Sequence, residues 1–170
     1  GDKRLIVALD VHNMEQVKRL VEELGNSVNY YKIGMELFYS VGPEVIHYLR
    51  ARNKNVFLDL KLHDIPNTVG QSLKVLTKLG VSMINVHASG GLTMMKKAVQ
   101  AVKEQAKESG QKAPLLIAVT VLTSIHQDEW DRMHCGEDIS KQVVDLAKLA
   151  QEAGMDGVVA SPQEADEIRK

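Results

Sequence analysis

Short apolar runs alternate with amphipathic stretches along the chain, and this alternation predicts strands and helices in turn. Runs rich in Leu, Ile and Val are expected to form strands at residues 5–10, 30–35, 56–62, 83–87, 115–122 and 157–160. Their nearly continuous apolar character is typical of parallel strands that are buried on both faces. Between them, apolar residues recur at the spacing of one helix face, in stretches that begin near Asn13, Pro43, Thr68, Gly91 and Ile139. The sequence Ser-Pro-Gln-Glu at 161–164 predicts a capping box that opens a sixth helix.

This strand–helix rhythm predicts a parallel α/β fold, either an open doubly wound sheet or a (β/α)8 barrel. Neither G-x-G-x-x-G nor G-x-x-x-x-G-K-[ST] occurs where a nucleotide-binding sheet would carry it. Polar residues stand instead at the C-terminal ends of several strands, where barrel enzymes keep their chemistry. We therefore expect one (β/α)8 TIM barrel domain over residues 1–170, C-terminally incomplete because only about six β/α units are present.

The composition indicates a single compact domain and argues against nucleic acid and membranes as partners. The chain has 170 residues, 44% of them hydrophobic, which suits one compact domain with a core. A net charge of −1 and an aromatic content of 4% favour neither nucleic acid nor a membrane surface as partner. No apolar run reaches the length of a membrane span, and the single cysteine, Cys135, suits a reducing compartment. We expect a cytoplasmic protein.

The third predicted strand carries charges that a buried strand should not hold. Strand alternation places Leu58, Leu60 and Leu62 on one face. Asp59 and Lys61 then share the other face, and Asp64 follows just past the strand end. Buried charges are unfavourable unless they are paired. Three charges of alternating sign in this segment therefore indicate a site rather than a structural salt bridge.

Other strands offer weaker candidates, each with a structural alternative. Asp10 ends the first strand, where an acid is more often a turn or cap residue. Lys32 lies inside the second strand, and its stem could extend to solvent instead. His87 ends the fourth strand and is more readily a hydrogen-bonded neighbour of a site than a ligand. His63 is expected at a rim or turn, and the glycines 90–91 form either an anion site or a plain turn.

Metal ligands are not expected. His126, His134 and Cys135 lie in one predicted loop, but their spacing matches no usual structural zinc site. Lysines and carboxylates without metal ligands point to proton transfer stabilised by fixed charges. A lysine flanked by aspartates keeps its proton and can give it to a carbanion.

Several motifs together resemble orotidine 5'-phosphate decarboxylase of the prokaryotic stand-alone type. The run from Asp59 to Thr68, D-L-K-L-H-D-I-P-N-T, is the most specific of them. The others are A-L-D at 8–10, K-I-G-M-E-L-F at 32–38, N-V-H-A at 85–88 and L-T-S at 122–124, in the family's order.

The resemblance implies a metal- and cofactor-free decarboxylation of orotidine 5'-phosphate to UMP in pyrimidine biosynthesis. Asp59 would face the substrate carboxylate, and Lys61 would protonate C6. The resemblance also implies that Asp10 and Lys32 bind the ribose hydroxyls and complete the charge network, with Lys32 counted among the catalytic residues. Thr123 and Ser124 would contact the nucleotide and its pyrimidine, and Asn85 and His87 would lie behind the site. In a homodimer, Asp64, Ile65 and Thr68 would reach into the neighbouring subunit's site.

The chain departs from the family in lacking the seventh and eighth β/α units. In the family these supply a phosphate-binding arginine and a closing loop, so the chain alone is expected to bind substrate weakly and turn over slowly or not at all. Two alternatives stay open. One is a magnesium-dependent sugar-phosphate decarboxylase or synthase, although such enzymes carry glutamate at the position of Lys32 and lack the continuation I-P-N at 65–67. The other is an inactive half-barrel that serves as a dimerisation module.

Overall fold

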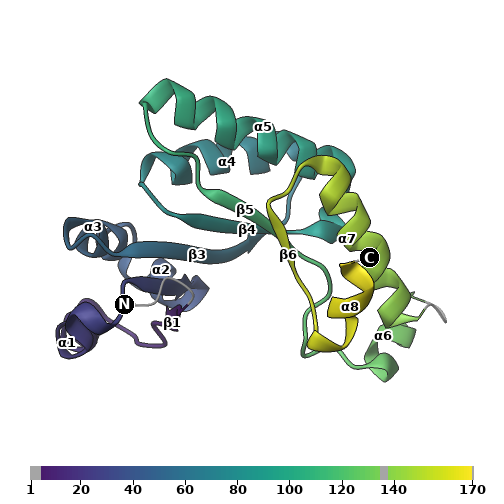
Figure 1. Cartoon of the computed structure of the whole chain (residues 1–170), viewed down its shortest axis with the longest axis horizontal. Coiled ribbons are helices and arrows are strands. Elements are labelled where there is room, and N and C mark those ends of the chain that lie inside the picture. Colours follow the sequence, from purple (N-terminus) through teal and green to yellow (C-terminus); the bar gives the residue numbers. More distant parts are fainter. Residues whose placement is uncertain (1–4, 135–137, 170) are drawn as a thin grey trace. The chain divides into compact units, whose positions relative to one another are not determined.

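The computed structural model describes residues 5–134 and 138–169 (Figure 1). Six strands occur in the described residues: β1 (Val7–Ala8), β2 (Tyr30–Gly34), β3 (Asn55–Leu62), β4 (Met83–His87), β5 (Leu115–Val119) and β6 (Gly157–Val159). The α-helices there are α1 (Met14–Leu24), α2 (Met35–Val41), α3 (Glu44–Ala51), α4 (Pro66–Lys78), α5 (Leu92–Ser109), α6 (Gln127–His134), α7 (Ile139–Ala153) and α8 (Ala165–Ile168).

The sheet order settles which α/β architecture the chain adopts. The strands are hydrogen-bonded neighbours in chain order, β1-β2-β3-β4-β5-β6. The registers described for β1 with β2, β2 with β3, and β5 with β6 are all parallel. A doubly wound sheet would reverse its strand order at a switch point, whereas a barrel adds each new strand to the same edge. The predicted partial (β/α) barrel with six strands is therefore confirmed.

Local signals in the sequence set the ends of the helices. The Asn13 side chain accepts a hydrogen bond from the Gln16 N–H at 2.9 Å and caps α1, as predicted. Gly25 ends that helix with φ of +51°, in a region that favours glycine. Asp138 caps α7 by accepting from Ser140 N–H. The helix α5, in the amphipathic stretch expected after Gly91, has a buried side that includes Met94, Met95, Ala98, Val102 and Ala106.

Some predicted boundaries were wrong. The first strand is confined to Val7–Ala8, and β5 stops at Val119 rather than at residue 122. Two helices were not predicted, α2 directly after β2 and α6 in the region expected to be a loop. The capping box is only half formed, since Ser161 Oγ accepts from Gln163 N–H while Glu164 Oε1 accepts from Ser140 Oγ.

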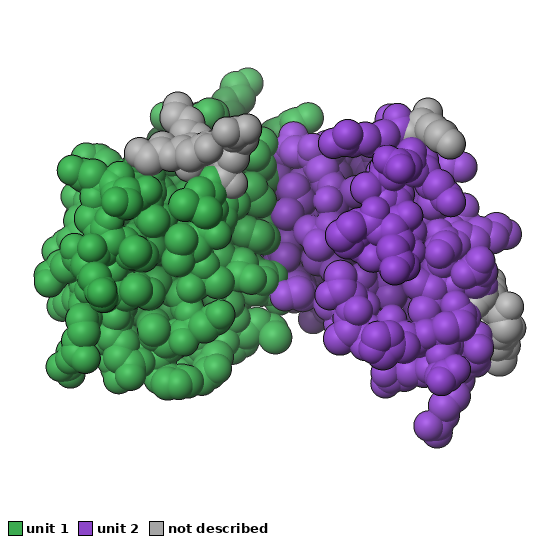
Figure 2. Space-filling view, turned by 60° about the horizontal axis from the view of Figure 1, so that its bottom comes forward, with its two compact units in different colours: residues 1–60, 74–84, 103–115 green, residues 61–73, 85–102, 116–170 purple. Residues whose placement is uncertain are grey.

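The chain comprises two compact units, coloured separately in Figure 2. Unit 1 contains residues 1–60, 74–84 and 103–115, and fully buried side chains in it include Tyr31, Ile33 and Leu58. Unit 2 contains residues 61–73, 85–102 and 116–170, and its buried side chains include Leu73 and Trp130.

Candidate active site

In unit 1, β2 and β3 bring a lysine and an aspartate together. Lys32 occupies the middle of β2, and Asp59 pairs in register with Gly34 at the C-terminal end of that strand. The Lys32 Nζ lies 3.8 Å from Asp59 Oδ2, with side-chain exposures of 37% and 12%. Lys32 therefore faces a largely buried carboxylate, and its charge is not directed to solvent alone. This arrangement favours the site interpretation of Lys32 over the structural one.

Asp10 follows β1 by two residues and is exposed. The backbone leads to it through Leu9, whose N–H donates to the Lys32 carbonyl at 2.9 Å. Lys32 lies level with Ala8, the last residue of β1, and Asp10 follows two residues later, so both stand near the C-terminal end of β1. This is the edge at which barrel enzymes place substrate-binding groups.

In unit 2, the backbone of Lys61 has an unusual conformation. Its φ is +53°, in the left-handed region, and only Asn53 shares this feature among the described non-glycine residues. Such a conformation costs a residue with a Cβ roughly 1–2 kcal/mol. The Lys61 N–H donates to Asn85 Oδ1 at 2.9 Å, and Asn85, on β4, is 1% exposed. Strain held in place by a buried polar group is a feature that clusters at functional sites.

The two histidines of this region face each other. The ring centroids of His63 and His87 are 5.6 Å apart, with a tilt of 50° between the ring planes. His63 is exposed, as expected of a rim residue, and His87 is half-buried at the end of β4. Gly90 and Gly91 follow in a turn, where the Gly91 N–H donates to the Ala88 carbonyl. Because a backbone carbonyl already uses this N–H, the turn interpretation of the glycines is favoured.

Asp64, Ile65 and Thr68 lie on the surface at the start of α4. The Asp64 Oδ1 accepts from the Ile65 N–H at 2.7 Å, which closes a local turn before the helix. Ile65 is 66% exposed, and Thr68 is also exposed. An isoleucine this exposed, beside an acid and a threonine, is suited to contacting something outside the chain.

Thr123 and Ser124 follow β5 and are exposed. Thr123 contributes to a cavity of about 330 Å³ in unit 2, together with His126, Ile139 and Glu164. Glu164 is buried, and its Oε1 accepts from Ser140 Oγ at 3.2 Å. The described geometry thus places Thr123 beside a concave surface.

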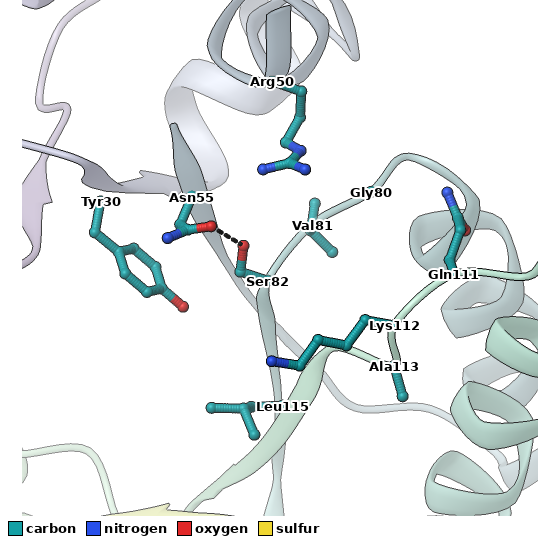
Figure 3. Close-up of a pocket in the computed structure, with 10 residues that line it drawn as sticks. All are labelled: Tyr30, Arg50, Asn55, Gly80, Val81, Ser82, Gln111, Lys112, Ala113 and Leu115. Carbon is teal, nitrogen blue, oxygen red and sulfur yellow. Dashed lines mark hydrogen bonds between the residues drawn. The ribbon is translucent and has the colours of Figure 1, made fainter. Parts of the chain in front are cut away.

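A separate cavity of about 420 Å³ lies in unit 1 (Figure 3). It is at the N-terminal ends of β2 and β3. Tyr30 and Asn55, the first residues of β2 and β3, line it together with Arg50 and Lys112. The candidate residues stand further along these strands, towards their C-terminal ends. This cavity is therefore distinct from the candidate active site, although it is larger than the cavity beside Thr123.

Metal binding was not predicted, and no cluster for it is seen where the chain is described. Across residues 5–134 and 138–169, no three or more His, Cys, Asp or Glu side chains are grouped so as to hold a metal ion. Cys135 and the side chain of His134 lie outside the described residues. Within those same ranges, no helix combines the length and the apolar character that crossing a membrane requires.

Sequence reasoning missed two contacts. It gave no means of finding the bond from Lys61 to Asn85, because the two positions are 24 residues apart and the left-handed backbone is not encoded by residue type. It also missed a pair formed by His12 Nδ1 and Glu36 Oε1, 2.7 Å apart and both exposed. Glu36 belongs to α2, a helix that the sequence pattern did not predict.

Comparison with known proteins gives one consistent result. The family model described as "Orotidine 5'-phosphate decarboxylase / HUMPS family" matches residues 3–170. A protein of Carboxydothermus hydrogenoformans named orotidine 5'-phosphate decarboxylase is 49% identical over 98% of this chain and 69% of its own length. A protein of the same name from Syntrophomonas wolfei is 46% identical over 99% of this chain and 72% of its own length.

Solved structures agree with these sequence matches. The crystal structure of orotidine 5'-phosphate decarboxylase from Lactobacillus acidophilus superposes with a TM-score of 0.89 at 42% identity, over 97% of this chain and 74% of that one. An uncharacterized conserved protein from Geobacillus kaustophilus gives a TM-score of 0.90 at 41% identity, over 96% of this chain and 76% of that one. With the charged motif of β3, the strand order and these matches in agreement, the chain belongs to the orotidine 5'-phosphate decarboxylase / HUMPS family of enzymes.

Proposed function

We propose that this chain catalyses the decarboxylation of orotidine 5'-phosphate to uridine 5'-monophosphate, without metal or organic cofactor. The observation that carries the proposal is the charged strand β3, which holds Lys61 two residues after an aspartate already paired with Lys32. The names of the relatives support the same reaction. An array of fixed charges on rigid strands is the kind of site that stabilises charge developing in a transition state.

The reaction requires one bond to break and one proton to move. The bond between C6 and the carboxylate breaks, its electron pair stays on C6, and CO2 leaves. The Lys61 ammonium then donates a proton to C6, and the resulting amine takes a proton back from water. Lys61 contributes to the rate through its positive charge, because that charge interacts more strongly with a developing carbanion than with the bound substrate.

Asp59 and Lys32 act with Lys61 in catalysis. Asp59 faces the substrate carboxylate, while Asp10 and Lys32 bind the ribose hydroxyls and complete the charge network. Thr123 and Ser124 contact the nucleotide. Asn85 and His87 lie behind the reacting groups.

The homodimer is part of this proposal. Asp64, Ile65 and Thr68 of one subunit complete the site of its neighbour. Their exposure at the start of α4 supports this assignment, because side chains that served their own subunit's core would be covered.

The test is a spectrophotometric assay of orotidine 5'-phosphate in EDTA, with Lys61→Ala as the variant. We expect the native chain to consume the substrate slowly at best, since the binding groups of the seventh and eighth β/α units are absent, so the assay runs at high protein concentration and over long times. Lys61→Ala should lower kcat by about 10²–10⁴-fold, the range that general acid catalysis supplies. Lys96→Ala, an exposed lysine on α5, is the matched control and should be unchanged.

Binding is measured alongside turnover by thermal shift with a 6-substituted uridine monophosphate. Stabilisation of the native chain by this analogue would support the assigned site even where turnover is slow. A chain that neither consumes the substrate nor is stabilised by the analogue would overturn the proposal. Equal rates for the native chain and Lys61→Ala would remove Lys61 as proton donor.

A second candidate follows from the breadth of the family, whose description also includes HUMPS. A magnesium-dependent reaction on a sugar phosphate would use the same D-x-K-x-x-D spacing. Against it, β2 carries Lys32 at the position where the sequence resemblance assigns glutamate to such enzymes, and this lysine approaches Asp59. Decarboxylation of orotidine 5'-phosphate that survives EDTA favours the nucleotide reaction, whereas an absolute requirement for magnesium favours the second candidate.

A further inference from the structure

The left-handed backbone at Lys61 needs an explanation beyond its residue type. Glycine, asparagine and aspartate visit this region most readily, whereas a lysine gains nothing there from its own side chain. Yet β3 continues through this position to Leu62. Some contact in the folded protein must therefore select this conformation.

Asn85 provides such a contact. Its Oδ1 accepts the Lys61 N–H at 2.9 Å, which is good hydrogen-bond geometry. Asn85 lies in β4 between Ile84 and Val86, which are fully buried, and is itself 1% exposed. Burial prevents water from replacing the asparagine at this N–H, so the bond to Lys61 N–H is lost when the Asn85 acceptor is removed.

The conformation at residue 61 also determines where the lysine side chain points. In a regular strand, successive side chains alternate strictly between the two faces. A left-handed residue departs from this alternation and changes the direction of its Cα–Cβ bond relative to the strand. The direction in which the Lys61 side chain leaves the backbone is thus set by this conformation.

We propose that Asn85 is a positioning residue, whose side-chain amide holds the Lys61 backbone in the left-handed conformation that directs its ammonium to the reacting carbon. The catalytic part of this proposal rests on the proposed decarboxylation. The structural part concerns the bond from Lys61 N–H to Asn85 and stands apart from any activity.

Two substitutions separate the bond from the packing. Asn85→Leu has a side chain of similar size but no acceptor, whereas Asn85→Asp keeps the shape and an acceptor oxygen but replaces the amide donors with a carboxyl group. Its melting temperature is therefore measured beside its exchange rate and kcat. Thr77→Val, at another buried polar position (2% exposed) on α4, is the control for general loss of a buried polar group. Amide hydrogen exchange at Lys61, followed by NMR, reports on the bond directly.

We expect Asn85→Leu to speed exchange of the Lys61 amide at least tenfold, and Asn85→Asp and Thr77→Val to leave it near the native rate. In the kinetic assay, Asn85→Leu should lower kcat by about 10²-fold, as expected of a misplaced catalytic group, while KM changes less than about threefold. Asn85→Asp should recover most of the lost kcat. A purely structural role would lower the melting temperature without this split between kcat and KM.

The outcomes are distinguishable. Unchanged exchange at Lys61 in Asn85→Leu would overturn the proposal at its structural step. Faster exchange with native kcat would overturn the positioning role. If the native chain shows no decarboxylation, the proposed function fails while the exchange measurement still decides the structural step. If Asn85→Leu fails to fold, the kcat of Asn85→Asp tests the proposal, because this variant keeps the acceptor of the Lys61 N–H. A kcat about 10²-fold below the native value, at a native melting temperature, would then overturn the proposal.

Discussion

Single residues in this chain show how a buried charge can serve the fold instead of a reaction. Lys54 is 6% exposed, and its Nζ donates to the carbonyls of Gly25 and Val28, each at 2.8 Å. These carbonyls belong to the turn that follows α1, so the lysine ties that turn to the start of β3. Lys54 is thus a structural lysine. By contrast, the Lys32 ammonium approaches the Asp59 carboxylate, and the backbone N–H of Lys61 donates to Asn85.

Replacing Lys54 tests this structural role. Lys54→Met keeps the apolar stem and removes the three donors, leaving the buried carbonyl of Val28 and the partly buried one of Gly25 without this partner. We expect the free energy of unfolding to fall by about 2–4 kcal/mol, since each unsatisfied buried acceptor costs roughly 1–3 kcal/mol. Urea denaturation measures the change, and Lys103→Met on the exposed side of α5 is the control. A loss no larger than that of the control would show that the carbonyls are satisfied in another way.

At the residue scale, the sequence located the charged groups but not their geometry. Asp59, Lys61 and Lys32 stand out because strands that are otherwise apolar should not contain them. The partner of Lys61 could not be predicted, because the bond joins a backbone N–H to a side chain on another strand and depends on a positive φ. The raised pKa values of the Tyr30 and Tyr31 hydroxyls could not be predicted either. Their cause is burial, which depends on the folded chain.

At the scale of elements, a helix was predicted where apolar residues recur over several turns and missed where they do not. Helix α6 has only Trp130 and Met133 as large apolar residues, and Trp130 alone is buried among them. Helix α2 begins directly after β2 and contains aromatic and β-branched residues, so its sequence resembles a continued strand. Strand β1 is short because it lies at an edge of the described sheet and pairs only with β2 there.

The cap of α1 gives a quantitative test at this scale. Asn13→Ala removes the acceptor of the Gln16 N–H and should lower the free energy of unfolding by about 1 kcal/mol. Asn13→Ser keeps a capping oxygen and should remain within a few tenths of a kcal/mol of the native chain. Thermal unfolding followed by circular dichroism compares the two variants. Equal losses would mean that the interaction of His12 N–H with Gln16 Oε1 suffices to hold this helix start.

At the scale of the whole molecule, the sequence predicted the parallel barrel because the order of elements and the placement of polar residues agree. Short apolar runs followed by Asp10, His87 and Thr123 favour a parallel sheet, because barrel enzymes carry their polar groups at the C-terminal ends of such strands. The division into two compact units was not predicted. The chain passes between the units inside β3, α4, β4, α5 and β5, first between Leu60 and Lys61, where no change of composition marks a boundary.

The proposed homodimer predicts that two inactive variants recover activity when they are mixed. A site built from one subunit alone does not predict this recovery. If Lys61 acts in its own subunit's site and Asp64 in the neighbour's, then Lys61→Ala and Asp64→Ala are each nearly inactive as homodimers. Mixing them after subunit exchange creates heterodimers in which one site has both native residues and the other has neither. By random pairing within an isologous dimer, about a quarter of the native activity should return. Sedimentation velocity on the same samples reports whether dimers are present.

The size of the recovery distinguishes the possible arrangements. If Asp64 served its own subunit's site, every heterodimer would contain one site without the lysine and one without the aspartate, and mixing would restore nothing. A dimer that exchanges subunits without recovery would therefore place Asp64 in its own subunit's site, and a chain that stays monomeric would remove the shared site altogether. Recovery requires Asp64 and Lys61 to meet across a subunit boundary, which would explain why Asp64 and its neighbour Ile65 are exposed at the start of α4.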